Sequence, residues 1–246
     1  MIRGLYLATD GMLTQERRID VVIHNLSHAE TVGFKEDKLL TQSFEDQMVA
    51  RVYGYDTRHA TPIGPFSSGV FLDETTTLFT PGPFEETGLD TDLAIEGDGF
   101  FVVTTPKGPR YTKAGHFTVS AEGYLVTPEG YTVQGQQGPI QTNGQPFSVD
   151  QNGLVRTANG TSQLQLVRFA DLSALQKEGE NLYSSQTAPE QGGVMVRQGF
   201  LEQSNVDLAD QVTNLILIQR QYELNQRVLR LMDERLGHSV NEIARI

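Results

Sequence analysis

The sequence predicts an α+β protein with long N- and C-terminal helices that pair as a coiled coil, joined by a central antiparallel all-β domain. All ten prolines and 20 of the 24 glycines lie between residues 54 and 199. Proline costs about 3 kcal/mol and glycine about 1 kcal/mol inside a helix, so the two ends are predicted to be helical and the centre to consist of strands and turns. Apolar residues recur every seven positions at both ends and every second position in the middle.

The first helix is predicted from a heptad repeat near the N-terminus. It consists of one apolar row at seven-residue intervals and a second row three positions further on: Leu5, Met12, Ile19 and Leu26, then Ala8, Val22 and Ala29. This spacing is typical of a coiled-coil seam, in which Gln15 is a polar member that can fix the register. Gly33 is expected to end the helix.

The last helix is predicted to begin at Ser204, an N-cap residue, with Asp207 in the first turn. Its apolar row and the flanking positions are Leu208, Leu215, Tyr222, Leu229, Leu236 and Ile243, with Val212, Ile218, Met232 and Val240. A single stripe of this kind usually packs on the protein's own core. Six heptad positions span about 54 Å, however, which is more than a domain of this size covers. The seam therefore requires a partner, and the first candidate is the other terminal helix.

The central region alternates apolar and polar residues in short runs bounded by turn dipeptides. The predicted strands are Leu93–Glu96, Phe100–Thr105, His116–Val119, Tyr124–Thr127, Tyr131–Gln134, Phe147–Val149, Leu154–Thr157 and Gln163–Phe169. The turns are Glu122-Gly123, Glu129-Gly130, Asn143-Gly144, Asn152-Gly153 and Asn159-Gly160, which supply positive φ in hairpins. These features predict an antiparallel β domain.

The expected domain organisation has three parts. Residues 1–35 and 203–246 form a helical assembly domain, and residues 86–202 form a β-rich outer domain. Residues 36–85 form a linker or extended segment, in which the spacing of Leu40, Phe44 and Met48 suggests a short helix.

Composition excludes several classes of function. The net charge is −12, and residues 51–200 carry 16 acidic and 9 basic side chains, which disfavours nucleic acid as a partner. Without cysteine there is no disulfide and no thiolate site. The longest aliphatic run, Leu215–Ile218, is far shorter than the ~20 residues that cross a bilayer. The N-terminal residues lack the pattern of a cleavable signal peptide, so any export is expected to use another route.

Motifs that could carry chemistry are weak. Gly97-Asp98-Gly99 lacks the third glycine of a dinucleotide loop and is interpreted as a β-turn leading into Phe100. His24 and His28 have a metal-ligand spacing without a third ligand nearby. The Asp150–Gly153 turn lacks the terminal glutamate of a calcium loop. We therefore predict no catalytic, cofactor or metal site.

Two rival functions stay open from the residues alone. Asp90 and Asp92 could serve a hydrolase only if they faced each other across a cleft. A β-domain carbohydrate-binding module or adhesin would account for the acidic centre, although it gives no reason for heptads at both ends.

Three blocks of sequence resemble the signatures of the flagellar basal-body rod and hook family. The N-terminal block is Leu5-Tyr6 through Gly11-Met12, Asn25-Leu26 and Thr31-Val32-Gly33-Phe34-Lys35. The central block is Glu96 through Val103, Arg110 through Gly115 and Gly123 through Val126. The C-terminal block is Gly199-Phe200-Leu201-Glu202, Ser204-Asn205-Val206, Gln219-Arg220 and Tyr222. The blocks occur in the family's order and cover most of the chain.

The resemblance implies a structural subunit of the rod, built from a helical core layer and a β-rich outer domain. It also implies export by the flagellar type III apparatus and assembly with further copies and with other rod and hook proteins. Proximal rod proteins fit best, because the stretch from Tyr55 to Pro83 is short, and Gram-positive paralogues of this size remain an alternative. The expected assembly interface is Leu5, Met12, Ile19, Asn25, Leu26, Leu208, Val212, Leu215, Ile218, Tyr222, Leu229, Met232 and Leu236, with a structural turn at Gly97, Asp98, Gly99 and Phe100.

Overall fold

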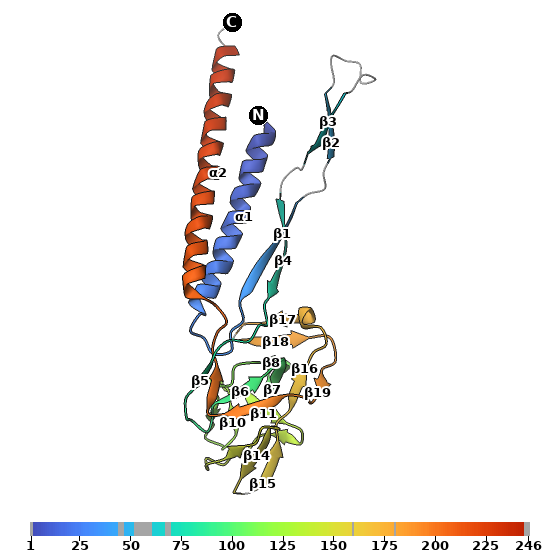
Figure 1. The fold of residues 1–246 in the computed structure, drawn as a ribbon, viewed down its shortest axis with the longest axis vertical. Helices are drawn as coiled ribbons and strands as arrows, with labels where there is room; N and C mark the ends of the chain where they lie inside the picture. Colours follow the sequence, from blue (N-terminus) through green and yellow to red (C-terminus); the bar gives the residue numbers. More distant parts are fainter. Residues whose placement is uncertain are drawn as a thin grey trace. The chain divides into compact units, whose positions relative to one another are not determined.

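The computed structural model contains two compact units, a helical unit and a β unit (Figure 1). The structure describes residues 2–43, 47–51, 61–66, 70–158, 160–179 and 181–243. The helical unit comprises residues 1–26, 37–76 and 208–246, and the β unit comprises residues 27–36 and 77–207. The α+β class, with one helix near each end and mostly antiparallel strands between them, is confirmed.

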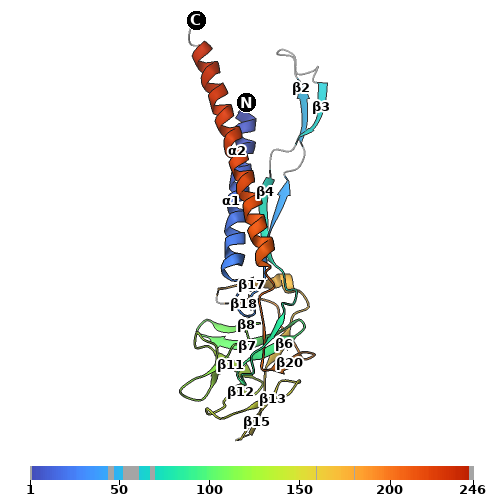
Figure 2. The ribbon, with the colours of Figure 1, turned by 60° about the vertical axis from the view of Figure 1, so that its left-hand side comes forward.

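The helical unit contains two long helices and two pairs of strands. Helix α1 spans Ile2–Ser27 and helix α2 spans Leu208–Ile243. They lie side by side and run in opposite directions (Figures 1 and 2). The paired strands are β1 (Asp37–Ser43) with β4 (Val70–Thr77), and β2 (Gln47–Arg51) with β3 (Thr61–Phe66). No helix among the described residues is long and apolar enough to cross a membrane.

The short helix suggested by Leu40, Phe44 and Met48 is wrong. Leu40 and Met48 lie in β1 and β2, whereas Phe44 lies outside the described residues. Exposed and half-buried residues alternate along residues 38–42, which is the period of a strand. In addition, the Asn25 side chain donates to the Asp37 carbonyl at 2.8 Å and accepts from the Asp37 N–H at 2.9 Å. It holds the start of β1 as a neighbouring strand would.

Both helices are shorter at their inner ends than predicted. Helix α1 ends at Ser27 rather than near Gly33, so Ala29 lies beyond it, and α2 begins at Leu208 rather than at Ser204. The intervening backbone groups bond within the β unit instead. The Gly33 N–H donates to the Glu202 carbonyl at 2.7 Å. At the other end α2 continues through the predicted seam to Ile243.

The β unit is built on one ten-stranded antiparallel sheet. Its main path and attached strands are β17 (Leu175–Lys177), β18 (Leu182–Ser185), β8 (Gly108–Thr112), β7 (Gly99–Thr105), β11 (Thr132–Gly135), β10 (Leu125–Val126) and β9 (Thr118–Val119), with β12 (Gly138–Pro139), β16 (Leu166–Arg168) and β19 (Glu190–Gln191). Smaller sheets are β13 (Ser148–Val149), β14 (Leu154–Thr157) and β15 (Gly160–Gln163); β6 (Leu93–Glu96) with β20 (Met195–Gln198); and β5 (Phe84–Glu86) with β21 (Phe200–Glu202). A 3₁₀ turn, η2, spans Leu172–Ala174.

Strand β7 separates two hydrophobic cores. Phe101 and Val103 point into a mainly aliphatic cluster, whereas Phe100 and Val102 point into an aromatic one. The run Phe-Phe-Val-Val is apolar on both faces because both faces are buried. Tyr183 packs edge-on to Phe100, with ring centres 5.8 Å apart.

The strand predictions hold where apolar patterning is strong. Strands Leu93–Glu96 and Leu154–Thr157 are confirmed, and so is the turn at Gly97, whose φ is +100°. The single strand predicted over Gln163–Phe169 is wrong, because β15 ends at Gln163 and β16 begins at Leu166. Strand β8 was not predicted, because it contains a glycine and a proline, which are uncommon inside strands.

Replacing Gly115 by alanine tests the packing of the β unit. The new Cβ would lie 1.5 Å from the Leu93 carbonyl oxygen, so backbone must move. We expect a loss of about 3 kcal/mol in the free energy of unfolding, measured by urea titration. The control is Gly130→Ala, where φ is +92° but no atom lies within 4 Å of the new Cβ. This variant should lose only about 1 kcal/mol, and equal losses would contradict the steric account.

Candidate assembly interface and buried ionic centre

A stripe of partly buried side chains runs along α2 with alternating spacings of four and three residues. Its members are Gln211, Leu215, Ile218, Tyr222, Asn225, Leu229, Met232 and Leu236. This is a heptad repeat, and six of the residues predicted for the assembly interface lie on it. Two others, Leu208 and Val212, are instead 48% and 43% exposed.

Small residues of α1 face this stripe. A Cβ added to Gly4 would lie 2.5 Å from Met232, and one added to Gly11 would lie 2.9 Å from Asn225. The two contacts set an antiparallel register and show that the helices approach closely at glycine positions. Ala8 is buried in the same way.

The main row predicted on α1 lies beside this contact rather than at its centre. Its four residues are only partly buried: Leu5, Met12, Ile19 and Leu26. Their side chains are too large for the close approach that glycine and alanine allow. The buried predicted residue is Asn25, which binds β1 and is 1% exposed.

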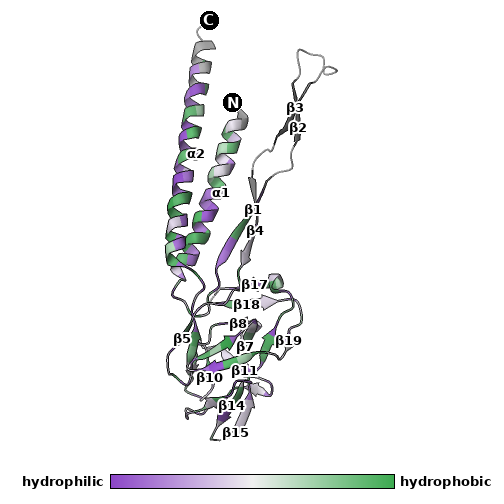
Figure 3. Cartoon of the chain, viewed as in Figure 1, coloured by the Kyte–Doolittle hydropathy of each residue, from purple (hydrophilic) through white to green (hydrophobic). Residues whose placement is uncertain are grey.

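A second set of apolar residues on α2 remains exposed. Leu217, Leu224, Val228 and Leu231 are 41–57% exposed. At 100° per residue they lie roughly 90–140° around the helix from the partly buried stripe. Figure 3 shows hydrophobic segments alternating with hydrophilic ones along the coloured part of α2. No described residue of the chain covers this outer row.

His24 and His28, the pair with metal-ligand spacing, have structural partners. His24 Nε2 lies 3.7 Å from Asp37 Oδ2. His28 Nδ1 lies 3.2 Å from the Thr31 hydroxyl, and its ring stacks on Phe34 with centres 4.8 Å apart. Across the described ranges, no group of three or more histidine, aspartate or glutamate side chains could hold a metal ion.

The β unit encloses an ionic centre formed by Lys35, Lys113 and Glu202. Their side chains are at most 1% exposed. Lys35 Nζ donates to Glu202 Oε1 at 2.5 Å, while Lys113 Nζ lies 3.9 Å from Glu202 Oε2. Two cations thus share one carboxylate inside the protein.

Backbone groups complete the ionic centre. Lys35 Nζ also donates to the Thr80 carbonyl at 2.9 Å, and the Gly82 N–H donates to Glu202 Oε1 at 3.1 Å. Lys113 Nζ donates to the Gly97 carbonyl at 2.8 Å. Glu202 Oε2, by contrast, accepts no hydrogen bond from the described residues.

The ionic centre contains two lysines and only one carboxylate, and the pKa of Lys113 is shifted. Burial lowers the pKa of Lys113, and the nearby Lys35 charge lowers it further, whereas Glu202 and Asp98 oppose the shift. A cation taken out of water without full compensation favours its neutral form.

The ionic centre joins segments that are far apart in sequence. Gly33 packs against the backbone of Lys113 and Ala114, where an added Cβ would lie 2.5 Å from the Ala114 nitrogen. Asn205 accepts from the Glu36 N–H at 2.8 Å and donates to the Leu78 carbonyl at 2.9 Å. The N-terminal, central and C-terminal blocks identified in the sequence therefore meet here.

The ionic centre was not predicted from the sequence. Lys35, Lys113 and Glu202 each stand in a quoted block, but none was assigned a role. The available signal was a charged residue directly after an apolar pair, as in Gly-Phe-Lys and Phe-Leu-Glu.

The acidic residues considered for catalysis do not face one another. Asp92 is buried with its Oδ1 3.2 Å from His116 Nδ1, whereas Asp90 is exposed. Asp150 Oδ1 accepts from the Gln151 N–H at 2.7 Å, within its own turn.

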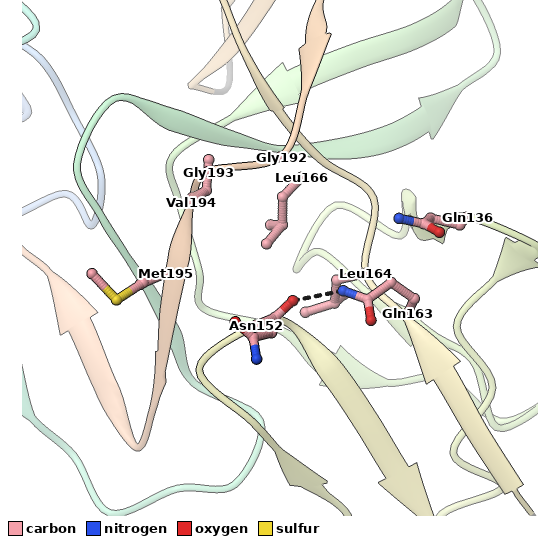
Figure 4. Close-up of a pocket in the computed structure, with 9 residues that line it drawn as sticks. All are labelled: Gln136, Asn152, Gln163, Leu164, Leu166, Gly192, Gly193, Val194 and Met195. Atoms are coloured by element: carbon pink, nitrogen blue, oxygen red, sulfur yellow. Dashed lines mark hydrogen bonds between the residues drawn. The ribbon is translucent and has the colours of Figure 1, made fainter.

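The β unit also has a pocket of about 300 Å³ without any titratable side chain (Figure 4). It is lined by Gln136, Asn152, Gln163, Leu164, Leu166, Gly192, Gly193, Val194 and Met195. Amides, glycines and aliphatic side chains supply neither a nucleophile nor a general base.

Two family models match the chain. Residues 94–162 match the D1 domain of the flagellar hook protein FlgE/F/G, and residues 197–242 match the C-terminal region of the flagellar basal body rod FlgEFG protein.

Curated relatives match over the full length. The chain is 34% identical to the flagellar basal-body rod protein FlgG of Bacillus subtilis, over 98% of this chain and 99% of that relative. It is 35% identical to the flagellar basal-body rod protein FlgF of Caulobacter vibrioides, over 100% and 98%. The flagellar hook-basal body complex protein FlhO of Bacillus subtilis is 30% identical over the whole of both chains.

Breaking the ionic centre should destabilise the β unit unequally. Lys35→Met removes the closest cation from Glu202 and leaves it only the Gly82 N–H and the more distant Lys113, so we expect a loss of about 3 kcal/mol in the free energy of unfolding. Lys113→Met leaves the Lys35–Glu202 pair intact and removes a hydrogen bond to Gly97, which should cost about 1–2 kcal/mol. Chemical denaturation of the two variants measures the difference. A greater loss for Lys113→Met would contradict this arrangement.

Stability should rise with pH because of Lys113. Its folded pKa lies below the unfolded value of 10.5, so between the two values the unfolded chain binds more protons and alkali favours folding. Tyr111, whose pKa burial raises from 10.0, acts in the opposite direction, but only at higher pH. We expect the free energy of unfolding, measured by denaturation from neutral pH up to about pH 10, to rise more in the native chain than in Lys113→Met. Equal slopes would refute the assignment to Lys113.

Proposed function

The chain belongs to the flagellar basal-body rod and hook family, in its FlgF/FlgG group, and we propose that it polymerises through its terminal helices into the helical, torque-transmitting rod. It is a structural protein of the flagellar basal body and not an enzyme. It associates with other rod and hook proteins.

The observation that carries this proposal is the exposed outer row on α2. Leu217, Leu224, Val228 and Leu231 form a row far too regular for scattered surface residues. Burying the rest of one such side chain is worth about 1 kcal/mol. These four side chains recur over about four turns of α2, which offers a neighbouring subunit a continuous apolar contact surface.

The second element of the proposal is coiled-coil pairing of α1 with α2. Its support is the heptad stripe of α2 and the close contacts of Gly4 and Gly11. Helices gain little stability without packing partners. We therefore expect the two helices of a free subunit to be partly disordered and to become ordered on assembly.

Open-ended assembly follows from the geometry of such contacts. Identical contacts between unlike surfaces generate a helical filament when their rotation does not close a ring. In that arrangement each subunit shares its helices with several neighbours, and torque passes through many seams at once. Delivery of the chain by the flagellar type III export apparatus belongs to the same proposal.

We propose that the chain belongs to the proximal part of the rod. The short segment between Tyr55 and Pro83 supports this placement. Identities of 35% to a FlgF protein and 34% to a FlgG protein do not separate the two types.

Charged substitutions in the outer row test the proposal. Leu224 and Leu231 are each 57% exposed, so Leu224→Glu with Leu231→Glu should leave the structure of the free subunit unchanged. Buried against a neighbour, the two carboxylates should abolish rod assembly and reduce swimming in soft agar at least about tenfold. The control is Arg227→Gln with Arg230→Gln, which changes the net charge equally and should swim normally. Normal motility and normal basal bodies in the leucine variant would refute the proposed seam.

A further inference from the structure

One face of the β unit combines an exposed methionine and an exposed arginine with two half-buried aromatic side chains. On β20, Met195 is 51% exposed, and Arg197 projects to the same side of the strand. The guanidinium carbon of Arg197 lies 4.2 Å from the Phe200 ring centre and 6.0 Å from that of Phe84. Methionine, arginine and aromatic residues are the types enriched in protein interfaces. We call this surface, Phe84, Met195, Arg197 and Phe200, the β20 face.

The pocket of about 300 Å³ lies beside the start of β20, because Met195 is one of its lining residues, although its side chain points away from the others in Figure 4. Leu164, Leu166 and Val194 provide apolar lining. Gln163 Nε2 donates to the Asn152 carbonyl at 2.6 Å, which orders one side of the rim. None of the nine lining residues carries a charge. The cavity therefore suits one uncharged side chain.

Four exposed carboxylates surround the β20 face. Glu96 stands directly opposite Met195 in the β6–β20 pair, and Glu86 stands opposite Phe200 in the β5–β21 pair. Asp98 follows Glu96 in the adjoining turn, and the Asp90 carbonyl accepts from the Gln198 side chain at 2.8 Å. Within the described part of the chain, no basic side chain lies within 4.0 Å of these four carboxylates.

We infer that the β20 face binds a positively charged polypeptide segment of a different protein. One uncharged side chain of that segment enters the pocket, and lysines or arginines beside it meet Glu86, Glu96 and Asp98. Interfaces commonly combine an anchor in a pocket with a surrounding polar rim. Complementary charge on the rim sets the choice of partner and the rate of encounter.

Charge argues against a second copy of this chain as the partner. The β unit carries 17 acidic and 8 basic side chains. Two such units approaching through this face would place like charges together, which costs several kcal/mol. The self-assembly proposed above uses residues of α1 and α2, none of which belongs to the β20 face. The inference rests on the proposed function only in that the partner is met at the basal body.

Site-specific photocrosslinking tests the inference. The photoreactive residue p-benzoylphenylalanine replaces Met195 in the full chain in motile cells, and exposed Glu129 is the control position. After irradiation of cells and of isolated basal bodies, mass spectrometry identifies the crosslinked peptide. We expect a lysine- or arginine-rich segment of another protein, crosslinked from position 195 but not from 129.

Charge reversal provides the matched control. Glu86→Lys with Glu96→Lys should reduce the crosslink at least about tenfold, whereas Glu122→Lys with Glu129→Lys changes the net charge equally and should preserve it. A crosslink to a second copy, no crosslink, or a crosslink equally sensitive to both double variants would overturn the inference. An immunoblot of basal bodies separates the two proposals. If the chain is present in basal bodies but gives no crosslink, only the docking surface is refuted. If a crosslink forms but the chain is absent from basal bodies, only the rod assignment is refuted.

Discussion

The buried pair of Lys35 and Glu202 is the contact on which the β unit depends. The two residues are 167 positions apart, one shortly after α1 and the other shortly before α2. Their side chains are 0% and 1% exposed, so the pair can form only when the core has closed around it. Folding of the β unit therefore brings together the segments that lead into the two terminal helices.

A buried ion pair contributes little to stability, because desolvation offsets its attraction and apolar replacements often do as well. Its value here lies in specificity. Only one alignment of the N-terminal and C-terminal segments places Glu202 beside Lys35 while the Gly82 N–H reaches the same oxygen. Gly33 permits the close backbone approach that this alignment requires. Lys113 brings a third segment, from the centre of the sequence, to the same point. We interpret its unfavourable burial as the energetic cost of holding that segment there.

Patterns that depend on local periodicity were readable from the sequence. The heptads predicted both helices, and the apolar run after Gly99 predicted a strand. The features that the sequence did not predict depend on contacts between residues far apart along the chain. Gly33 looks like a helix stop, but its N–H is used by Glu202, and the helix ends six residues earlier. On α1 the large apolar row is the obvious seam, yet the row of small residues beside it permits the closest approach. The ionic centre depends on contacts across most of the chain, which no local pattern encodes.

The lengths of the two helices limit what one subunit can bury. Helix α1 has 26 residues and α2 has 36. The antiparallel register places Gly4 beside Met232, so the described part of α1 ends opposite residue 234 or thereabouts. Beyond that point α2 still carries Leu236, which is partly buried, and Val240, which is 64% exposed. The described part of α1 therefore does not reach the last turns of α2, and the outer row stays exposed. Under the proposed assembly through the helices, this difference in length leaves apolar surface on α2 that a neighbouring subunit would cover, which a helical hairpin with arms of equal length would not offer.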